Sequence, residues 1–219
     1  MKGKYLLILL FSLISASGKC QYNDFGPGYQ LTLLGNPGLT GSEGVGSLRL
    51  SYLNFYPGNR FNIHSVNVSY DGYFPALHGG AGFYVSNDNL NGIINNLRGG
   101  FSYAYHFQAA RDLFISASLS ASVCHRGYDF SGAILPDQID PMRGAVLPSG
   151  EILDLKGKSV LDLSTGFLFM SEHYFGGVAV NHLTEPDTDD SGYSESRINR
   201  RLLLHMAGYS RKIFSIYRQ

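Results

Sequence analysis

The stretch Asp112–Val123 (DLFISASLSASV) places the strongest constraint on how this chain can fold. Apolar residues occupy every second position from Leu113 to Val123, and Phe114 followed by four serines fills the positions between them. Successive side chains of a β-strand point to opposite faces, so this period of two predicts a strand. Its polar face carries hydroxyls rather than the lysine and glutamate typical of a soluble surface strand. We therefore expect the apolar face to lie in lipid and the serine face to line a lumen.

The same alternation recurs along the chain and predicts about eight strands. Each is close to the roughly ten residues that a tilted transmembrane strand needs. Besides the stretch above, one strand begins at Ser47. The other six cover about 61–71, 77–86, 98–108, 159–170, 174–182 and 202–214. Alternating aromatic residues in 98–108 are typical of the interfacial girdle of a membrane barrel. The fold class that follows is all-β, an antiparallel up-and-down transmembrane β-barrel.

The segments between these strands are rich in turn residues. We expect turns at 36–38 (NPG), 56–59 (YPGN), 108–111 and 172–173, and a polar loop at 86–96. Alternation lapses between Arg126 and Lys158, and a connection of that length is typical of a long extracellular barrel loop. A second polar loop follows from residue 184 to residue 200.

The first 20 residues have the pattern of a cleaved export signal. Lys2 and Lys4 precede an apolar stretch that is too short for an ordinary membrane-spanning helix. We expect cleavage after Cys20, with cuts after Ser17 or Gly18 also acceptable. A lipoprotein anchor at Cys20 fits less well, because a lysine stands directly before it.

Three regions are therefore expected in the whole chain. A signal peptide covers residues 1–20, a periplasmic lead-in with turns covers 21–46, and 47–219 forms the N-terminal part of an outer-membrane β-barrel domain. Cleavage after Cys20 leaves Cys124 as the only cysteine, so no internal disulfide can form. We interpret Cys124 as a small residue at the end of a strand rather than as a reactive thiol.

Charge is scarce and excludes some partners. Only 16% of the residues are charged, against roughly 25% in globular domains. Lysine and arginine equal aspartate and glutamate at 17 each, so losing the lysines of the signal leaves a mildly acidic protein. Such a chain gives no reason to expect nucleic acid as a partner.

No arrangement of residues predicts a metal or cofactor site. Asp187, Asp189, Ser191 and Gly192 match early EF-hand positions, but Ile198 stands where the bidentate glutamate belongs. We interpret this run, which includes Asp190, as a solvated acidic loop. The histidines lack metal-site spacing and are expected to face the lumen or lie in loops. They are His64, His78, His106, His125, His173, His182 and His205.

No catalytic residues are predicted either. A barrel hydrolase needs a serine activated by a histidine and an acid, and no local signature selects such a pair. The serines at 116–122 are explained more simply as the polar wall of the lumen. Gly-rich phrases such as HGGAG do not lead into a helix, so a phosphate-binding role is disfavoured.

Several phrases, in order, resemble one family. They are NPGLTG, SYD followed by LHGGAGFYVSND, FSYAYHF, LPDQIDPMRG and GVAVNHLTEP. Together they cover nearly the whole chain after the signal and resemble the PorP/SprF outer-membrane proteins of the Bacteroidetes type IX secretion and gliding machinery. We interpret the matching positions first as turn and loop structure: Asn36, Pro37, Gly41, Gly79, Gly80, Asp137, Pro141, His182, Leu183 and Pro186.

The resemblance implies a noncatalytic outer-membrane barrel without cofactors. Its implied partners are type IX secreted cargo such as gliding adhesins, and the periplasmic ring and peptidoglycan-linked components of the machine. Relatives continue through further hairpins where this chain ends at Gln219, so we expect an incomplete, truncated barrel. Two other functions stay open: a small barrel enzyme acting on lipid or lipopolysaccharide, and a solute channel through the serine- and glycine-rich lumen.

Overall fold

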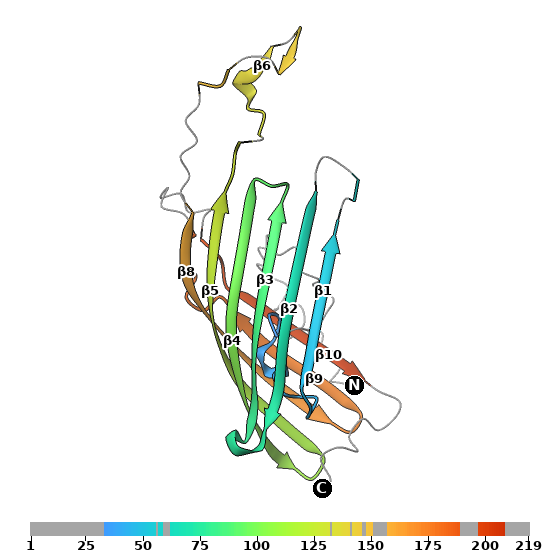
Figure 1. The fold of residues 1–219 in the computed structure, drawn as a ribbon. Helices are drawn as coiled ribbons and strands as arrows, with labels where there is room; N and C mark the ends of the chain where they lie inside the picture. The colour runs from blue at the N-terminus through green and yellow to red at the C-terminus, as the bar shows by residue number, and fades with distance from the viewer. Residues whose placement is uncertain are drawn as a thin grey trace, which may run out of the picture.

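One curled antiparallel sheet makes up most of the described structure. The computed structural model describes residues 33–55, 57–58, 62–131, 133–140, 142–145, 148–150, 157–188 and 197–208. Within them, the sheet has eight strands in the order β1-β2-β3-β4-β5-β8-β9-β10. It curves around a concave face like part of a barrel wall (Figure 1). The all-β antiparallel prediction and the number of strands are thus confirmed, and within the described residues β1 and β10 form two edges that do not pair with each other.

Strands β3, β4, β5 and β8 are longer than the alternation alone predicted, whereas β9 is one residue shorter. Their bounds are β1 Ser47–Asn54, β2 Ile63–Phe74, β3 Gly79–Leu90, β4 Ile94–Ala110, β5 Leu113–Tyr128, β8 Lys158–Ser171, β9 Tyr174–Asn181 and β10 Arg201–Gly208. Short 3-10 turns η1, η2 and η3 cover Pro37–Leu39, Pro75–Leu77 and Pro136–Gln138, and β6 (Ile139–Asp140) and β7 (Gly144–Ala145) form a separate hairpin. No helix in the described part of the chain is long and apolar enough to cross a membrane.

Strand β5 has the two faces that its sequence predicts. Its serines at 116, 118, 120 and 122 are all buried on the concave side, whereas Leu119 and Val123 are about half exposed on the convex side. The period of two is kept through the pairing with β4 and β8, because Ser120 lies opposite Ser102 and Ser164. The orientation of this strand is therefore confirmed.

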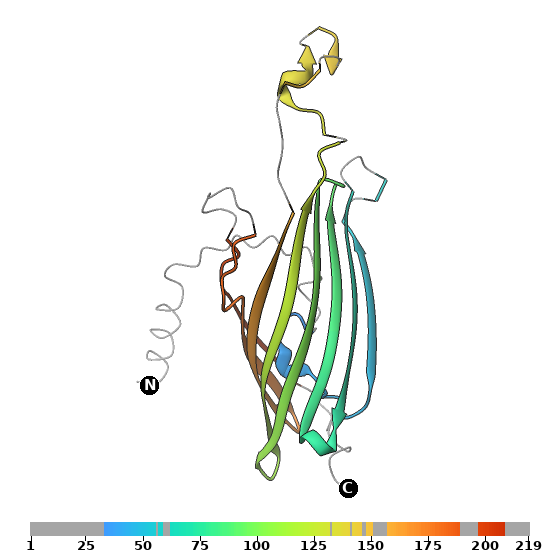
Figure 2. The same ribbon diagram turned by 60° about the vertical axis from the view of Figure 1, so that its left-hand side comes forward.

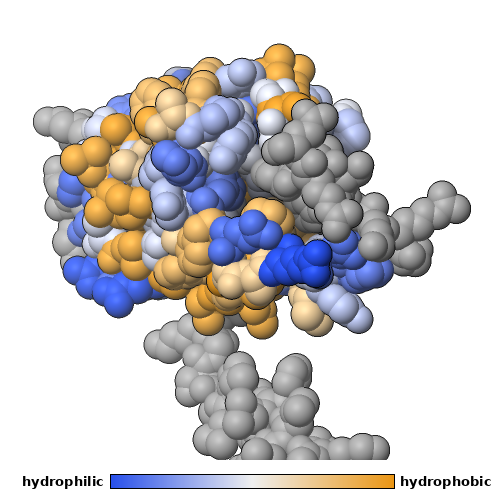
Figure 3. Space-filling model, turned by 90° about the horizontal axis from the view of Figure 1, so that it is seen from below, coloured by the Kyte–Doolittle hydropathy of each residue, from blue (hydrophilic) through white to orange (hydrophobic). Residues whose placement is uncertain are grey.

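Exposed apolar side chains form a belt over the convex face of the sheet. On β4, Phe101, Tyr103, Tyr105 and Phe107 all point outward, and Phe101 is 74% exposed. Orange residues occupy much of the outer margin when the molecule is seen from below (Figure 3). We call the following residues the convex belt: Leu48, Leu50, Tyr52, Tyr70, Phe83, Val85, Leu97, Phe101, Tyr103, Tyr105, Phe107, Leu119, Val123, Leu161, Leu163, Phe167, Phe169, Tyr174, Leu202, Leu204 and Met206.

The two ends of the sheet differ in their connections. One end, here the turn end, carries the short connections 75–78, 111–112 and 172–173. The other, the loop end, carries the connections 55–62, 91–93, 129–157 and 182–200. The hairpin of β6 and β7 projects well beyond the sheet at the loop end (Figure 2).

The polar loop predicted at 86–96 is wrong. Strand β3 continues to Leu90 and β4 already begins at Ile94, so a tight hairpin replaces the loop. Asn91 and Gly92 both have positive φ, 56° and 75°. Asn-Gly favours this turn because both residues tolerate positive φ, and the turn twists in the same sense as the flanking strands. Strand β5 likewise continues to Tyr128, so Cys124 lies inside a strand rather than at its end.

Several predictions concern residues outside the described ranges. They include the signal peptide, its cleavage site, Pro141, Asp189, Asp190 and the chain after Gly208. The division of the chain into three regions stays a prediction.

Candidate functional site

The concave face of the sheet holds a buried segment, Asn36–Gly41, which we call the plug (Figure 2). The Asn36 side chain accepts a hydrogen bond from the Gly38 N–H at 2.8 Å and so begins the 3-10 turn. The Thr40 hydroxyl closes that turn by donating to the Pro37 carbonyl at 2.7 Å. Asparagine before proline and glycine is typical of such a turn, because its side chain hydrogen-bonds the backbone two residues on. The turn predicted at Asn36–Gly38 is present, but sequence reasoning did not predict that it packs inside the sheet.

Asn36 and Gly35, the residue before the plug, connect the plug to strands β8, β9 and β10. Its Nδ2 donates to the Phe167 carbonyl at 3.4 Å and lies 2.8 Å from Nε2 of His205. One residue earlier, the Gly35 carbonyl accepts a hydrogen bond from Asn181 Nδ2 at 2.9 Å. Three strands that are distant from the plug in sequence therefore hold its first residues.

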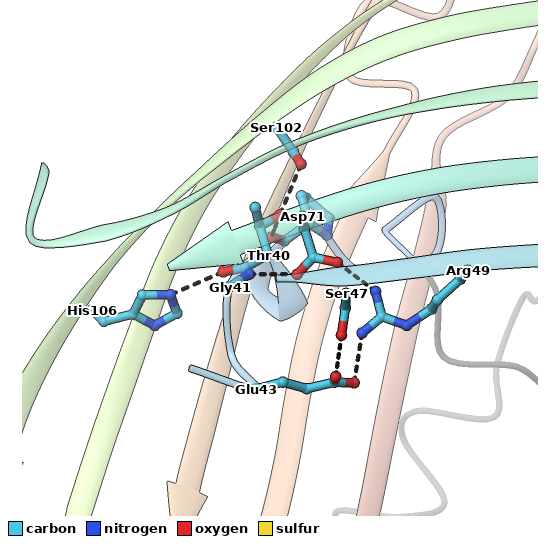
Figure 4. Close-up of polar contacts among 9 residues, drawn as sticks. Thr40, Gly41, Glu43, Ser47, Arg49, Asp71, Ser102 and His106 are labelled. Atoms are coloured by element: carbon cyan, nitrogen blue, oxygen red, sulfur yellow. Dashed lines mark hydrogen bonds and ion pairs between the residues drawn. The ribbon is translucent and has the colours of Figure 1, made fainter. Parts of the chain in front are cut away.

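Strands β4 and β5 hold the middle of the plug. Ser116 donates to the Gly38 carbonyl at 2.9 Å, and the hydroxyls of Thr40 and Ser102 are 2.8 Å apart. His106 Nε2 donates a hydrogen bond to the Thr40 carbonyl oxygen at 2.9 Å (Figure 4). Ser116 and His106 lie toward the turn end of their strands and Ser102 lies at the middle of β4, so the plug fills the concave face from the middle of the sheet toward the turn end.

A buried carboxylate fixes the end of the plug to β1 and β2. One oxygen of Asp71 accepts from the Gly41 N–H at 2.7 Å, and the other accepts from Arg49 (Figure 4). Arg49 also pairs with Glu43 at 2.6 Å, and Glu43 accepts from the Ser47 hydroxyl. The hydrogen bond from Ser47 lowers the pKa of Glu43, and the contacts with Arg49 add to this effect. A continuous polar network therefore joins the plug to the first strand.

Two glycines allow the plug to touch the sheet backbone. Gly41 has φ +69°, and a Cβ there would lie 2.5 Å from the Cα of Gly80. A Cβ on Gly80 would collide with the carbonyl group of Thr40. Gly79 and Gly80 were interpreted as turn structure, but both are the first residues of β3. Glycine is required at both positions because neighbouring backbone approaches closely there, not because the chain turns.

A small apolar core lies beside the plug. Leu39 of the plug packs with Leu33 and with side chains from β3 and β8. The buried members of this cluster are Leu33, Leu39, Tyr84, Leu168 and Met170.

At the loop end, a second segment is tied to the strands. His182 Nδ1 lies 2.6 Å from an oxygen of Asp162, and both side chains are buried. The hydroxyl of Thr188, also buried, accepts a hydrogen bond from Arg126 at 2.9 Å. We call His182–Thr188 the rim segment. The rim segment contains the last five residues of the phrase GVAVNHLTEP, whereas the first five belong to β9.

The chemistry of these groups does not match a hydrolase. The hydroxyl of Thr184 contacts the Asp162 carboxylate at 3.1 Å. In nucleophilic catalysis, the hydroxyl is hydrogen-bonded to the imidazole, and the carboxylate contacts the other side of the imidazole. Here the hydroxyl contacts the carboxylate instead. Three of the four serines of β5 donate to backbone carbonyl groups: Ser116 to Gly38, Ser118 to Gly166 and Ser120 to Phe101. They form the polar wall that the sequence predicts.

The histidines lie in several environments. His106 and His205 contact the plug, His182 begins the rim segment, and His78 and His173 lie in connections at the turn end. His64 and His125 differ from the prediction, because each lies in a strand on the convex face near the loop end. There they contact Tyr52 and Ser159. Within the described ranges, no group of three or more histidine, cysteine or acidic side chains could hold a metal ion.

The projecting hairpin, residues 133–150 where described, is held by two aspartates. Asp140 accepts from the backbone N–H groups of Met142 and Arg143 at 2.8 and 2.9 Å. Asp137 accepts from the backbone N–H of Gly150 at 2.8 Å and from the Ser149 hydroxyl. These contacts order the hairpin, yet Met142 at its tip is 94% exposed.

Comparison with known proteins identifies one family. The family model described as type IX secretion system membrane protein PorP/SprF matches residues 14–213. No curated protein matches the chain, and no solved structure matches it.

Proposed function

Because the chain belongs to the PorP/SprF family of type IX secretion system membrane proteins, we propose that it is a noncatalytic outer-membrane component of that system. It takes part in the secretion or cell-surface attachment of partner proteins such as gliding adhesins. The observation that carries the proposal is the division of the sheet into an apolar convex belt and a polar concave face. Such a division suits a barrel wall in lipid.

The unequal ends of the sheet support an orientation. Outer-membrane barrels have short periplasmic turns and long extracellular loops. The loop end is accordingly extracellular and the turn end periplasmic. The periplasmic ring and the peptidoglycan-linked components of the machine would then meet the turn end, and secreted cargo would meet the loop end.

The projecting hairpin is the part of the loop end best suited to contact cargo. The hairpin exposes three apolar side chains, Ile134, Ile139 and Met142. Lipid would not cover them, because the hairpin lies beyond the convex belt (Figure 2). The two aspartates order the hairpin before any partner binds, and this reduces the entropy lost on binding. Exposed apolar residues on an ordered element are typical of protein contact sites.

The plug supports this function over a solute channel. Asn36 and Thr40 are fully buried between the plug and the sheet, and they fill the concave face near the turn end. A permanently open pore would need that space. The enzyme alternative draws no support from the geometry, since the Asp162–His182 pair and the β5 serines have structural partners.

The first experiment tests location. Export and cleavage after Cys20 predict a mature protein that begins at Gln21 and sediments with the outer membrane. Membrane fractionation followed by N-terminal sequencing checks both points. Recovery of the folded protein in the soluble periplasmic fraction would refute the outer-membrane proposal.

The second experiment tests the contact with cargo. Met142→Asp should reduce the amount of cargo retained on the cell surface at least fivefold, while the variant itself still reaches the outer membrane. Leu77→Asp is the matched control, because Leu77 is also an exposed apolar residue but lies at the turn end. Equal cargo retention by both variants would remove the hairpin from the contact.

A further inference from the structure

A glycine on the convex face leaves a hollow in the belt. Gly176 of β9 pairs with Phe169 of β8 on one side and with Met206 of β10 on the other. On β9 itself, Tyr174 and Val178 are its neighbours on the same face, because alternate residues of a strand share a face. Four large side chains therefore surround a position that has no side chain.

This hollow is a groove of about 360 Å³. Leu113 and Leu204 extend its walls beyond the four neighbours of Gly176. No charged aspartate, glutamate, lysine or arginine lines it, and almost all of its surface is apolar. A Cβ on Gly176 would lie 3.3 Å from the His205 carbonyl oxygen, a tight contact, and 3.6 Å from Cγ of Met206. A side chain at this position would therefore press against β10 and occupy the groove.

The position of the groove indicates what fills it. Four of its wall residues belong to the convex belt: Phe169, Tyr174, Leu204 and Met206. The last three are strongly exposed. Gly176 is close to the connection 172–173 at the turn end, and aromatic residues such as Tyr174 mark the interfacial level of membrane barrels. In the proposed orientation, on which this inference rests, the groove opens into the periplasmic leaflet.

We propose that the groove over Gly176 is a binding site for one acyl chain of a phospholipid in the periplasmic leaflet. The chain lies between Phe169 and Met206, and the polar head group stays at the level of Tyr174 and the turn end. Acyl chains are flexible, uncharged and apolar, as the lining requires. Lipid molecules elsewhere on the belt lie against protruding side chains and exchange freely, whereas this one is enclosed on several sides.

Native mass spectrometry of the full chain, extracted from its membrane in mild detergent, tests the site. We expect the natural protein to retain one phospholipid and Gly176→Leu to retain at least fivefold less. Gly99→Leu is the matched control, since Gly99 lies on the convex face of β4 and a Cβ there would meet nothing closer than 4.0 Å. Equal retention by the two variants, or no retained lipid on the natural protein, overturns the proposal.

A second measurement keeps Gly176 unchanged, in case its variant fails to fold. The chain has no tryptophan, so a single inserted one is a clean fluorescent reporter. Leu204→Trp places it in the groove wall, and Leu202→Trp places it on the same face of β10 outside the groove. After brominated phosphatidylcholine is diluted with unbrominated lipid, quenching should persist at residue 204 at least fivefold longer than at residue 202. Equal decay at both positions overturns the site.

The outcome separates this proposal from the proposed function. If the protein fractionates with the outer membrane and retains cargo, but the lipid experiments fail, only the groove assignment is lost. If the protein is not in the outer membrane, the proposed function fails as well.

Discussion

The concave and convex faces of this sheet are built from the same strands but are specified in different ways. On the concave face, particular atoms meet: Asp71 accepts from Gly41, Ser116 donates to Gly38, and Gly80 leaves space for the Thr40 carbonyl. On the convex face, side chains are exposed and share only their apolar character. Changes on the concave face should therefore depend on chemical identity, whereas changes on the convex face should depend on hydrophobicity alone.

The difference follows from what each face contacts. The concave face meets a defined segment of the same chain, and buried polar groups lose free energy unless each finds its partner. In the proposed membrane location, the convex face meets a fluid solvent of acyl chains that adapts to any apolar shape. The groove over Gly176 is the one place on the convex face for which we propose that shape also matters.

The largest expected effect is that of Gly80→Leu. Its side chain would occupy the space of the Thr40 carbonyl, so either the plug leaves or the strands shift. We expect a loss of about 4 kcal/mol or more, a size typical of severe overpacking and strain. Urea unfolding in lipid vesicles, followed by circular dichroism, measures it. Ala81→Leu changes the next residue on the convex face and should cost less than about 1 kcal/mol. Equal losses would erase the contrast between the faces.

The next largest effect is expected at Asp71, a fully buried carboxylate. Asp71→Ala removes the acceptor for both Gly41 and Arg49 and should cost about 3 kcal/mol, as for breaking a buried ion pair. Arg49→Ala alone should cost a comparable amount, because it leaves the fully buried Asp71 carboxylate without its ion-pair partner. The double variant should lose less unfolding free energy than the sum of the two single losses, by about 1 kcal/mol or more. Strict additivity in the same unfolding assay would show that the two side chains act independently.

On the convex face, Leu119→Arg should cost about 2 kcal/mol, because Leu119 lies in the middle of β5 and a charge there would enter the centre of the bilayer. Leu119→Phe keeps the position apolar and should change the free energy of unfolding by less than about 1 kcal/mol. Refolding of each variant into lipid vesicles measures its free energy of unfolding. A Phe variant as damaging as the Arg variant would mean that this face is also specified by shape.

The smallest effect is expected for a single hydroxyl. Thr40→Val keeps the shape of the side chain but leaves Ser102 without its partner, at a cost of about 1 kcal/mol. Adding Ser102→Ala should recover part of that loss, because both polar groups are then gone. Thermal unfolding of the two variants side by side measures the difference. No recovery in the double variant would argue against the Thr40–Ser102 contact.

The strands and their faces were predictable because alternation is a local property. From Leu113 to Val123, the alternation alone predicts which face of the strand each residue occupies, whatever strand lies beside it. The turn at Asn91–Gly92 was also locally encoded, by a dipeptide that favours positive φ. The polar residues around it, which are typical of loops, masked that signal.

The plug depended on the tertiary structure instead. Asn36 and its contact His205 are separated by 169 positions, and no periodicity links two residues so far apart. The glycines of β3 offered a signal, since glycine inside a strand often marks close backbone approach. These glycines do not indicate which segment of the chain packs against them. The sequence alone determined which residues form strands and which face is apolar, because both follow from neighbouring residues. Only the curled sheet decided that Asn36–Gly41 lies inside it, since that place is created by seven separate strands together.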